Sequence, residues 1–363
     1  MATRFGISEV RPVRRGPPVT PWVSVRGVRV RLRSRQGGRR VDLVLGLLLL
    51  AGVLTGTAAN TIGVNWPLDL IQLHAAAALA VVLVAPWKYV VIRRGLKHPR
   101  RGRPTKALSI ALAALVLTTI ASGLIHSTGH LEFVGPLTLM QIHVGAAVGA
   151  LFAVAAHFLM HSVRPRRADA DRRALLSLGL LGTAAAAATA AWDLGAATSR
   201  RFTGSVPKPD LEVTAWINDS VQHLDPTTWT LQVGPTTLDL PTVLAMPHET
   251  FQATLDCTSG WYSNQEWQGI RLSTLLNQAG VTKDGWRSLE IRSATGYTRW
   301  FGADTLDRVW LATALNGRPL PYGHGYPARI VAPSRRGFWW IKWVTSMTPS
   351  PRPPWAQSFF PLS

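Results

Sequence analysis

Long apolar blocks dominate the first half of the chain, whereas apolar and polar residues alternate over short runs in the second half. A helix needs about 20 mostly apolar residues to cross the hydrocarbon layer of a membrane. Five blocks of that length occur, and we expect a transmembrane helix in each: residues 41–59, 68–92, 107–125, 140–160 and 174–192. The last block is only weakly apolar because alanine and glycine dominate it.

Beyond residue 204 the pattern is typical of strands. Short alternating or β-branched runs at residues 211–217 and 228–233 are bounded by Pro, Gly and Asn, and residues 272–278 favour a short helix. The predicted fold is therefore an α-helical membrane bundle of five spans followed by an α+β, strand-rich domain. The expected division is a basic cytoplasmic arm (1–40), the transmembrane domain (41–192), a linker (193–210), the α+β domain (211–350) and a tail (351–363).

Positive charge is placed beside the apolar blocks. The formal net charge is +20, from 39 Lys and Arg against 19 Asp and Glu, and eleven arginines lie in the first 40 residues. Further basic clusters at residues 93–106 and 164–173 adjoin apolar blocks, which follows the positive-inside rule. We therefore expect a multi-pass protein of the cell membrane, with its N-terminus in the cytoplasm and its C-terminal domain outside. No basic stripe interleaved with aromatics and no helix-turn-helix pattern occurs, which argues against a nucleic-acid partner.

A pair of arginines, Arg172 and Arg173, precedes the fifth apolar block. The pair resembles an internal twin-arginine signal, which predicts that the C-terminal domain folds in the cytoplasm and is exported folded. The alternative is an ordinary positive flank of a membrane span.

Cys257 is the only cysteine of the chain, which excludes an intrachain disulfide. It lies in the run FQATLDCTSGW (residues 251–261), and WQGIRLSTLL (267–276), LNGRPLP (315–321) and HGYPAR (324–329) follow in that order. These runs resemble the cofactor-binding core of the sulfite oxidase superfamily, over roughly residues 205–350. The alternative for a lone cysteine is burial as a small apolar side chain.

The resemblance implies a molybdopterin-binding oxidoreductase domain of sulfite-oxidase type that performs two-electron oxygen-atom transfer. It implies that the Cys257 thiolate binds molybdenum, a role that suits a soft, deprotonated ligand. It also implies contacts of His324, Arg329 and Lys342 with the pterin and its phosphate, for which fixed cationic groups are suited. Arg336 is a further candidate for this pocket.

The residues after Cys257 differ from the sulfite-oxidising branch, which has an arginine within a few positions of its cysteine. Here those positions are Thr258 to Tyr262, so sulfite is in doubt as the substrate. The spacing of Cys257 and Trp261 is more similar to the periplasmic methionine sulfoxide reductase branch, which implies a small-molecule or sulfoxide-type substrate. Trp261, Tyr297 and Arg299 are the candidates for lining the substrate pocket.

Two histidines, His74 and His143, lie a few residues inside the second and fourth apolar blocks. Ionisable residues within membrane spans are functional candidates, and two histidines at similar depth on two helices suit one b-type haem. Either His126 or His130 could replace one ligand. The alternative is that the histidines hydrogen-bond across the bundle or face water.

The predicted activity is that of a membrane-anchored molybdenum enzyme outside the cytoplasm, which exchanges electrons through its membrane domain with quinone or another carrier. One alternative is an enzyme without haem that passes its electrons to a separate carrier. A second is a cofactor-free membrane scaffold or sensor module that retains the fold.

Overall fold

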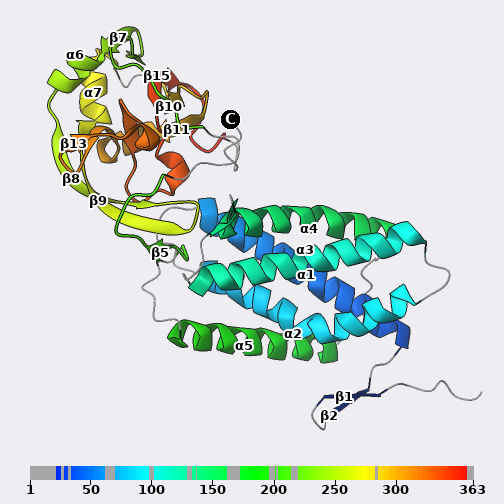
Figure 1. The fold of residues 1–363 in the computed structure, drawn as a ribbon. Helices are drawn as coiled ribbons and strands as arrows, with labels where there is room; N and C mark the ends of the chain where they lie inside the picture. The colour runs from blue at the N-terminus through cyan, green and yellow to red at the C-terminus, as the bar shows by residue number, and fades with distance from the viewer. Residues whose placement is uncertain are drawn as a thin grey trace, which may run out of the picture.

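The computed structural model describes residues 22–25, 28–31, 34–61, 70–97, 102–128, 133–135, 137–161, 172–195, 201, 203–213, 220–282 and 285–357. Long helices fill the first half, and a strand-rich domain follows them (Figure 1). The helices are α1 (Ser34–Thr61), α2 (Leu70–Leu96), α3 (Arg103–Thr128), α4 (Leu139–His161) and α5 (Arg172–Gly195).

The first four helices form a bundle in which α1 packs on α2 and α3 packs on α4. Each contains a stretch that is long and apolar enough to cross a membrane: Gly38–Ala59, Leu70–Leu96, Arg103–Thr128 and Leu139–Met160. Large apolar side chains such as Leu54, Leu117 and Phe152 are exposed on them, as expected for surfaces that face lipid.

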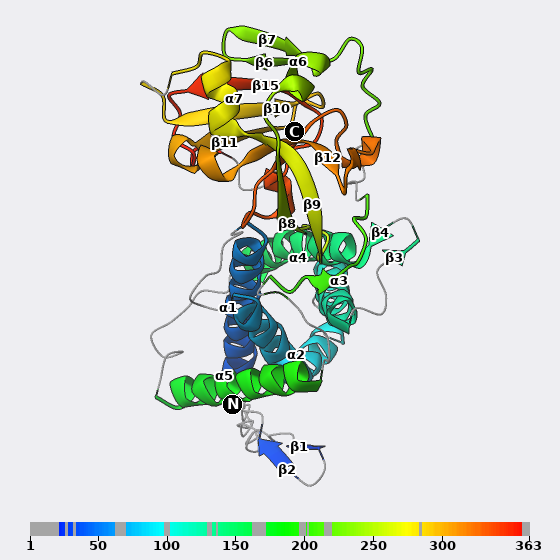
Figure 2. The same ribbon diagram turned by 90° about the vertical axis from the view of Figure 1, so that its left-hand side faces the viewer.

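The fifth expected span is not supported. Helix α5 has only a shorter apolar stretch, Leu176–Ala191, and it packs against α2 on the flank of the bundle (Figures 1 and 2). Sixteen residues rise by about 24 Å, which is less than the roughly 30 Å of the hydrocarbon core. The physical reason lies in the alanine and glycine residues, which are too weakly apolar to extend the stretch.

Two short hairpins accompany the helices: β1 (Trp22–Val25) with β2 (Val28–Arg31), and β3 (Phe133–Val134) with β4 (Leu137–Thr138). The first lies in the basic arm, at the end of the bundle remote from the strand-rich domain (Figure 2).

The second half contains two sheets around one core, which confirms the strand-rich domain. The first has the order β11-β10-β15-β6-β7, and the second has the order β13-β12-β9-β5, with β8 paired to β9 and β14 to β12. Their bounds are β5 (Val206–Pro207), β6 (Thr230–Val233), β7 (Thr236–Asp239), β8 (Glu249–Asp256), β9 (Trp261–Arg271), β10 (Ser288–Ser293), β11 (Thr298–Gly302), β12 (Trp310–Leu315), β13 (Arg318–Pro319), β14 (Arg329–Val331) and β15 (Val344–Ser350).

Short helices connect these strands. They are α6 (Leu240–Ala245), α7 (Leu272–Gln278) and the 3₁₀ turns η2 (Ala303–Arg308), η3 (Tyr322–His324) and η4 (Gly337–Trp339). The helix expected at residues 272–278 is confirmed as α7, and the expected strand at 228–233 is β6 with a later start. The strand expected at 211–217 is wrong for residues 211–213, which pair with no strand, and residues 214–217 lie outside the described residues. There, Leu211 packs on the core instead.

The core of this domain fixes the elements that carry the site. Trp267 of β9, Leu311 of β12 and Ile330 of β14 are fully buried in one apolar cluster. Strand β9 is 11 residues long, and its first end, beside β8, reaches the bundle between α3 and α4 (Figure 2). The tight connection between β8 and β9 therefore lies where the domain meets the helical bundle.

Candidate active site

Cys257 occupies the turn between β8 and β9. Its backbone N–H donates to the carbonyl of Trp261 (2.8 Å), and the N–H of Gly260 donates to the carbonyl of Cys257 (3.1 Å). The side chain is half-buried and packs against the domain core. Gly337 lies against this backbone, because a Cβ placed there would be 3.2 Å from the Cys257 Cα. The thiol is thus held on a short, doubly hydrogen-bonded turn.

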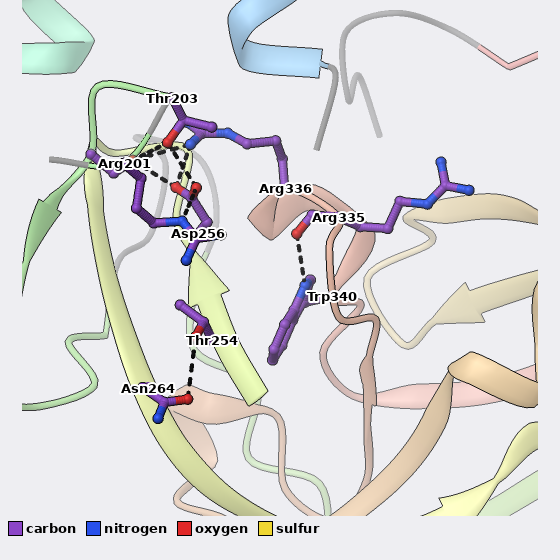
Figure 3. A network of polar contacts seen from close by, with 9 residues as sticks. Arg201, Thr203, Thr254, Asp256, Asn264, Arg335, Arg336 and Trp340 are labelled. Atoms are coloured by element: carbon purple, nitrogen blue, oxygen red, sulfur yellow. Dashed lines mark hydrogen bonds and ion pairs between the residues drawn. The ribbon is translucent and has the colours of Figure 1, made fainter. Parts of the chain in front are cut away.

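The residue before the cysteine, Asp256, is the centre of a buried polar network (Figure 3). Its carboxylate accepts from the hydroxyls of Ser205 (2.6 Å) and Thr203 (2.7 Å) and from Arg201 Nε (3.1 Å). It also pairs with the Arg336 guanidinium, which is itself buried and donates to Ser205 (3.0 Å). Both oxygens of a buried carboxylate are therefore satisfied by charged and hydroxyl donors, as burial of a charge requires.

Arg336 thus lies in the predicted site, with its guanidinium directed at Asp256. Burial lowers the pKa of Arg336, and the neighbouring Asp256 and Cys257 act in the opposite direction. Arg335, the residue before it, points away from the network and lies over the Trp339 ring at 4.7 Å (Figure 3). Only one of the two adjacent arginines therefore contacts the strand that leads to the cysteine.

Arg329 is fully enclosed between two tryptophans. Its guanidinium lies 5.2 Å from the Trp267 ring centre and 5.7 Å from that of Trp340, and it donates to the carbonyls of His324 and Trp340 (both 3.1 Å). Burial lowers the pKa of Arg329 to about 9, while the charge of Cys257 raises it. The group is therefore cationic at neutral pH and within electrostatic range of the thiol.

His324 and Lys342 lie beside Arg329. His324 is buried at the end of η3. Its desolvation, together with the positive charges of Arg329 and Lys342, lowers the pKa of His324 to about 4. The imidazole is consequently neutral at pH 7, and the two cations remain the charged members of this group. Lys342 Nζ lies 5.2 Å from the centre of the Trp343 ring.

Tyr297 and Arg299 form a second cluster that reaches the cysteine through η4. Arg299 Nε donates to the Tyr297 hydroxyl (2.7 Å), which donates to the carbonyl of Phe338 (2.7 Å). The Arg299 guanidinium is buried and lies 4.9 Å from the Phe338 ring centre and 5.8 Å from that of Trp339. Burial raises the pKa of Tyr297 to about 12, so the phenol stays protonated.

Trp261, the other predicted pocket residue, is a core residue at the start of β9. It is only 5% exposed, and it pairs with Val206 of β5. The structure therefore brings together Cys257, Arg329, Arg336, His324 and Lys342, and it places Tyr297 and Arg299 on the far side of η4.

Sequence reasoning missed Asp256, Arg201, Thr203 and Ser205. The last three were assigned to a linker, yet they tie it to the residue next to the cysteine. An acidic residue directly before the only cysteine of a strongly basic chain was the available signal for this network.

The second predicted site, the His74–His143 pair, is also brought together. The ring centres are 5.8 Å apart and the rings meet edge to face. His74 Nδ1 contacts the carbonyl of Gly52, and His143 Nδ1 contacts that of Thr119 (both 2.8 Å). A carbonyl only accepts, so Nδ1 carries the hydrogen and Nε2 keeps a lone pair, which is the tautomer that binds a metal through Nε2.

Glycines pack on both of these rings. A Cβ at Gly56 would lie 2.9 Å from His74 Cε1, and a Cβ at Gly123 would lie 3.0 Å from His143 Cε1. Of the alternative ligands, His126 lies in the last turn of α3, and His130 lies outside the described residues.

The half-buried Cys257 thiol lies on a tight turn, within electrostatic range of the buried guanidiniums of Arg329 and Arg336. A cysteine in such surroundings suits a metal or an anionic cofactor. The family described as "Oxidoreductase molybdopterin binding domain" matches residues 218–358. The uncharacterized oxidoreductase YuiH of Bacillus subtilis is 30% identical over 134 residues, which is 35% of this chain and 67% of that protein. The chain belongs to this family and is a molybdopterin-dependent oxidoreductase.

The matches to mitochondrial sulfite oxidases cover a smaller share of those proteins than the match to YuiH covers of YuiH. The human protein is 32% identical over 108 residues, which is 27% of this chain and 20% of that protein. The chain thus spans about a fifth of human sulfite oxidase. Among solved structures, the sulfane dehydrogenase SoxCD of Paracoccus pantotrophus is 28% identical over 37% of this chain and 41% of that one, with a TM-score of 0.35.

Proposed function

We propose that the chain is a membrane-anchored oxidoreductase outside the cytoplasm, in which Cys257 would hold the molybdenum cofactor that supplies two-electron oxygen-atom-transfer chemistry. His74 and His143 would hold a b-type haem, which when bound would supply one-electron exchange with a membrane carrier such as a quinone. The observation that carries the proposal is the position of Cys257 beside the buried cations Arg329 and Arg336.

The residues around Cys257 fit the molybdenum cofactor. The deprotonated form of cysteine is the one that binds a metal. Among the described residues, the buried Nε groups of Arg329 and Arg336 and the Nε1 of Trp339 have no hydrogen-bond partner, so donors remain for a bound group. Cys257 would hold the molybdenum, which when bound supplies the two-electron redox chemistry.

The remaining residues would bind and orient the pterin. Arg329 and Lys342 offer positive charge to its phosphate, and the neutral His324 can both donate and accept a hydrogen bond. Arg336 contributes by holding Asp256 and thereby the cysteine turn.

The histidine pair fits one haem. Both Nδ1 atoms are engaged by backbone carbonyls, which orients the rings and leaves the Nε2 atoms for iron. Gly56 and Gly123 remove side-chain bulk beside the rings.

The distribution of charge supports the proposed side of the membrane. Arg93 and Arg94 end α2, and Lys106 lies in the first turn of α3, so one end of the bundle is basic and by the positive-inside rule cytoplasmic. The domain contacts the other end, at Ile71 in the first turn of α2 and His126 in the last turn of α3. Helix α5 begins at Arg172, within the basic cluster at residues 164–173. Arg172 and Arg173 at its start are our candidate export signal.

The proposed substrate is a small molecule of the sulfoxide type. No arginine occurs among the residues Thr258 to Tyr262 that follow the cysteine, where the sulfite-oxidising branch has one. Arg299, connected to the cysteine through Tyr297 and η4, is the candidate donor to the substrate oxygen, and Tyr297, whose hydroxyl donates to Phe338 and accepts from Arg299, would orient it.

The first test is metal and pterin analysis of the full-length protein beside Cys257→Ser, with Thr254→Ser on the preceding strand as a matched control. We expect about one molybdenum per chain in the wild type and the control, and loss of the metal in Cys257→Ser. A maleimide should label the wild type only after the metal is removed, because the chain has a single thiol. A wild-type protein without molybdenum, made in a host that supplies the cofactor, would refute the proposal.

A reduced-minus-oxidised visible spectrum of the same samples tests the haem. A b-type band that disappears in His74→Ala and in His143→Ala, with molybdenum retained, supports the two-centre enzyme. Molybdenum without any haem band would leave the helices as an anchor and refute electron exchange through them.

A further inference from the structure

The two candidate redox sites meet at a single contact between the domain and the bundle. Gly260, the last residue of the Cys257 turn before β9, lies directly on the His126 ring, because a Cβ at this glycine would overlap the imidazole. The same Cβ would lie 3.2 Å from the Met140 Cε of α4. Gly260 also has a φ of +93°, so an L side chain is disfavoured by both backbone and space. The backbone of the cysteine turn therefore touches the histidine itself.

His126 lies between that contact and the histidine pair. It lies three residues after Gly123, which is about 4.5 Å along α3. Gly123 is the residue that packs on the His143 ring, and the His143 Nδ1 contact is to Thr119 one turn earlier. His126 and His143 are close enough to influence each other electrostatically. One helical turn thus separates the cysteine turn from the ring proposed to bind iron.

A second contact holds the domain on the other half of the bundle. Gly204, with a φ of +81°, lies against Ile71 of α2, since a Cβ there would be 3.0 Å from the Ile71 Cγ1. Ile71 precedes His74 by three residues on the same helix. The neighbours of this glycine, Thr203 and Ser205, donate to Asp256 beside the cysteine. On the domain side both contacts are made by glycine backbone, which brings the domain close to the side chains of the bundle.

We propose that the domain is permanently docked through Gly204 and Gly260, and that His126 is the positioning residue through which electrons pass between the Cys257 site and the His74–His143 site. This inference rests on the proposed function, because it requires a redox centre at each site. A two-electron conversion of substrate then needs two transfers of one electron each. In each transfer one site is oxidised by one electron and the other is reduced by one, with a quinone-type carrier as the final exchange partner.

The docking is tested without any cofactor. The photoreactive amino acid p-benzoylphenylalanine is placed at position 126 of the full chain, and the product of irradiation is digested. We expect a cross-link to the peptide that contains residues 257–261, and its loss when Gly260→Val is added. Gly280→Val is the matched control, because this glycine also has positive φ (+71°) but faces open space. A cross-link that is absent at position 126, or that survives Gly260→Val unchanged, would overturn the docking.

The route is tested in membranes or detergent with both centres loaded. A laser flash on free flavin delivers one electron to the haem, and the decay of the reduced haem band reports transfer to the other centre. We expect His126→Ala and Gly260→Ala to slow this decay by about tenfold or more, since small displacements of reacting groups cost large factors in rate. Gly280→Ala should leave it unchanged, and His126→Phe, which retains an aromatic ring at the contact, should restore much of the rate.

The variants must keep molybdenum, haem content and haem midpoint potential near the wild-type values for the rates to be compared. Equal decay rates in His126→Ala and the wild type would overturn the role of His126 and leave the two-centre enzyme intact. A wild type that lacks either centre would instead refute the proposed function.

Discussion

The Cys257 turn and the His74–His143 pair are held by different kinds of interaction. Around the cysteine, Asp256 and Arg336 form a buried ion pair with hydroxyl groups in contact. The two histidines, in contrast, are each held by a bond to a backbone carbonyl and by a glycine against the ring. Among the described residues, no acidic side chain hydrogen-bonds to either ring.

The difference follows from the surroundings of each site. A domain with water on its surface can bury charges where they are paired, whereas a helix surrounded by lipid, as we propose for the bundle, makes an unpaired charge costly. The stability of the cysteine site should therefore depend mainly on paired charges, and that of the histidine site on close packing around the rings. Substitutions that remove one charge should affect the cysteine site, and substitutions that add bulk without charge should affect the histidine site.

The largest effect is expected from Asp256→Asn. It leaves the Arg336 guanidinium buried and without its carboxylate partner, which typically costs about 3–5 kcal/mol of the free energy of unfolding. The change should also release the 201–205 segment from the cysteine turn and reduce molybdenum occupancy. Chemical denaturation followed by tryptophan fluorescence, together with metal analysis, measures both.

Glu290→Gln is the matched control for the loss of this charge, because Glu290 also pairs with an arginine, Arg292. Its partner Arg292 is half exposed, at 52% of its side chain, so the loss should be at most about 1 kcal/mol. Equal losses for the two variants would mean that burial of the Asp256 pair has no energetic importance.

The sequence predicted the parts of this molecule that depend on local pattern. Apolar length identified four helices that could cross a membrane, and the run around Cys257 led to the correct family. The fifth span failed because its alanine-rich sequence was too weakly apolar to be assigned by length alone.

Contacts between distant residues could not be read from the sequence in the same way. Asp256 and Arg336 are 80 positions apart, and Gly260 and His126 are further apart still. No periodicity relates such residues, because their meeting depends on how the domain is placed on the bundle. The expected linker was wrong at residues 203–205 for the same reason: small polar residues are typical of a loop, and their role depends on bonds to the distant Asp256 and Arg336.

A smaller effect is expected from added bulk at the histidine pair. Gly123→Leu forces a side chain against the His143 ring, and overpacking of this kind costs about 1–3 kcal/mol. Haem content should fall sharply while molybdenum occupancy stays near the wild-type value. The absorbance of the haem band per chain, measured beside molybdenum, tests this separation.

Gly145→Leu on α4 is the control, because a Cβ at this exposed position meets nothing within 4 Å. Loss of haem in both variants would indicate a general intolerance of the bundle to bulk. Retention of haem in Gly123→Leu would mean that the close packing of the ring is not needed.

The smallest effect concerns the protonation of His324. Burial and the neighbouring cations lower the pKa of His324 from the ordinary 6.5 to about 4, so between these values the unfolded chain binds a proton that the folded domain does not. Stability should therefore be complete above about pH 6.5 and decrease as the pH falls towards 4, by about 1 kcal/mol at pH 5 once partial screening by solvent is included. Thermal unfolding of the wild type and of His324→Asn, which cannot titrate, at about pH 7 and pH 5 isolates this contribution. We expect a smaller decrease for the variant; parallel decreases would show that the imidazole is already protonated in the folded domain and that the cations beside it tolerate a third positive charge.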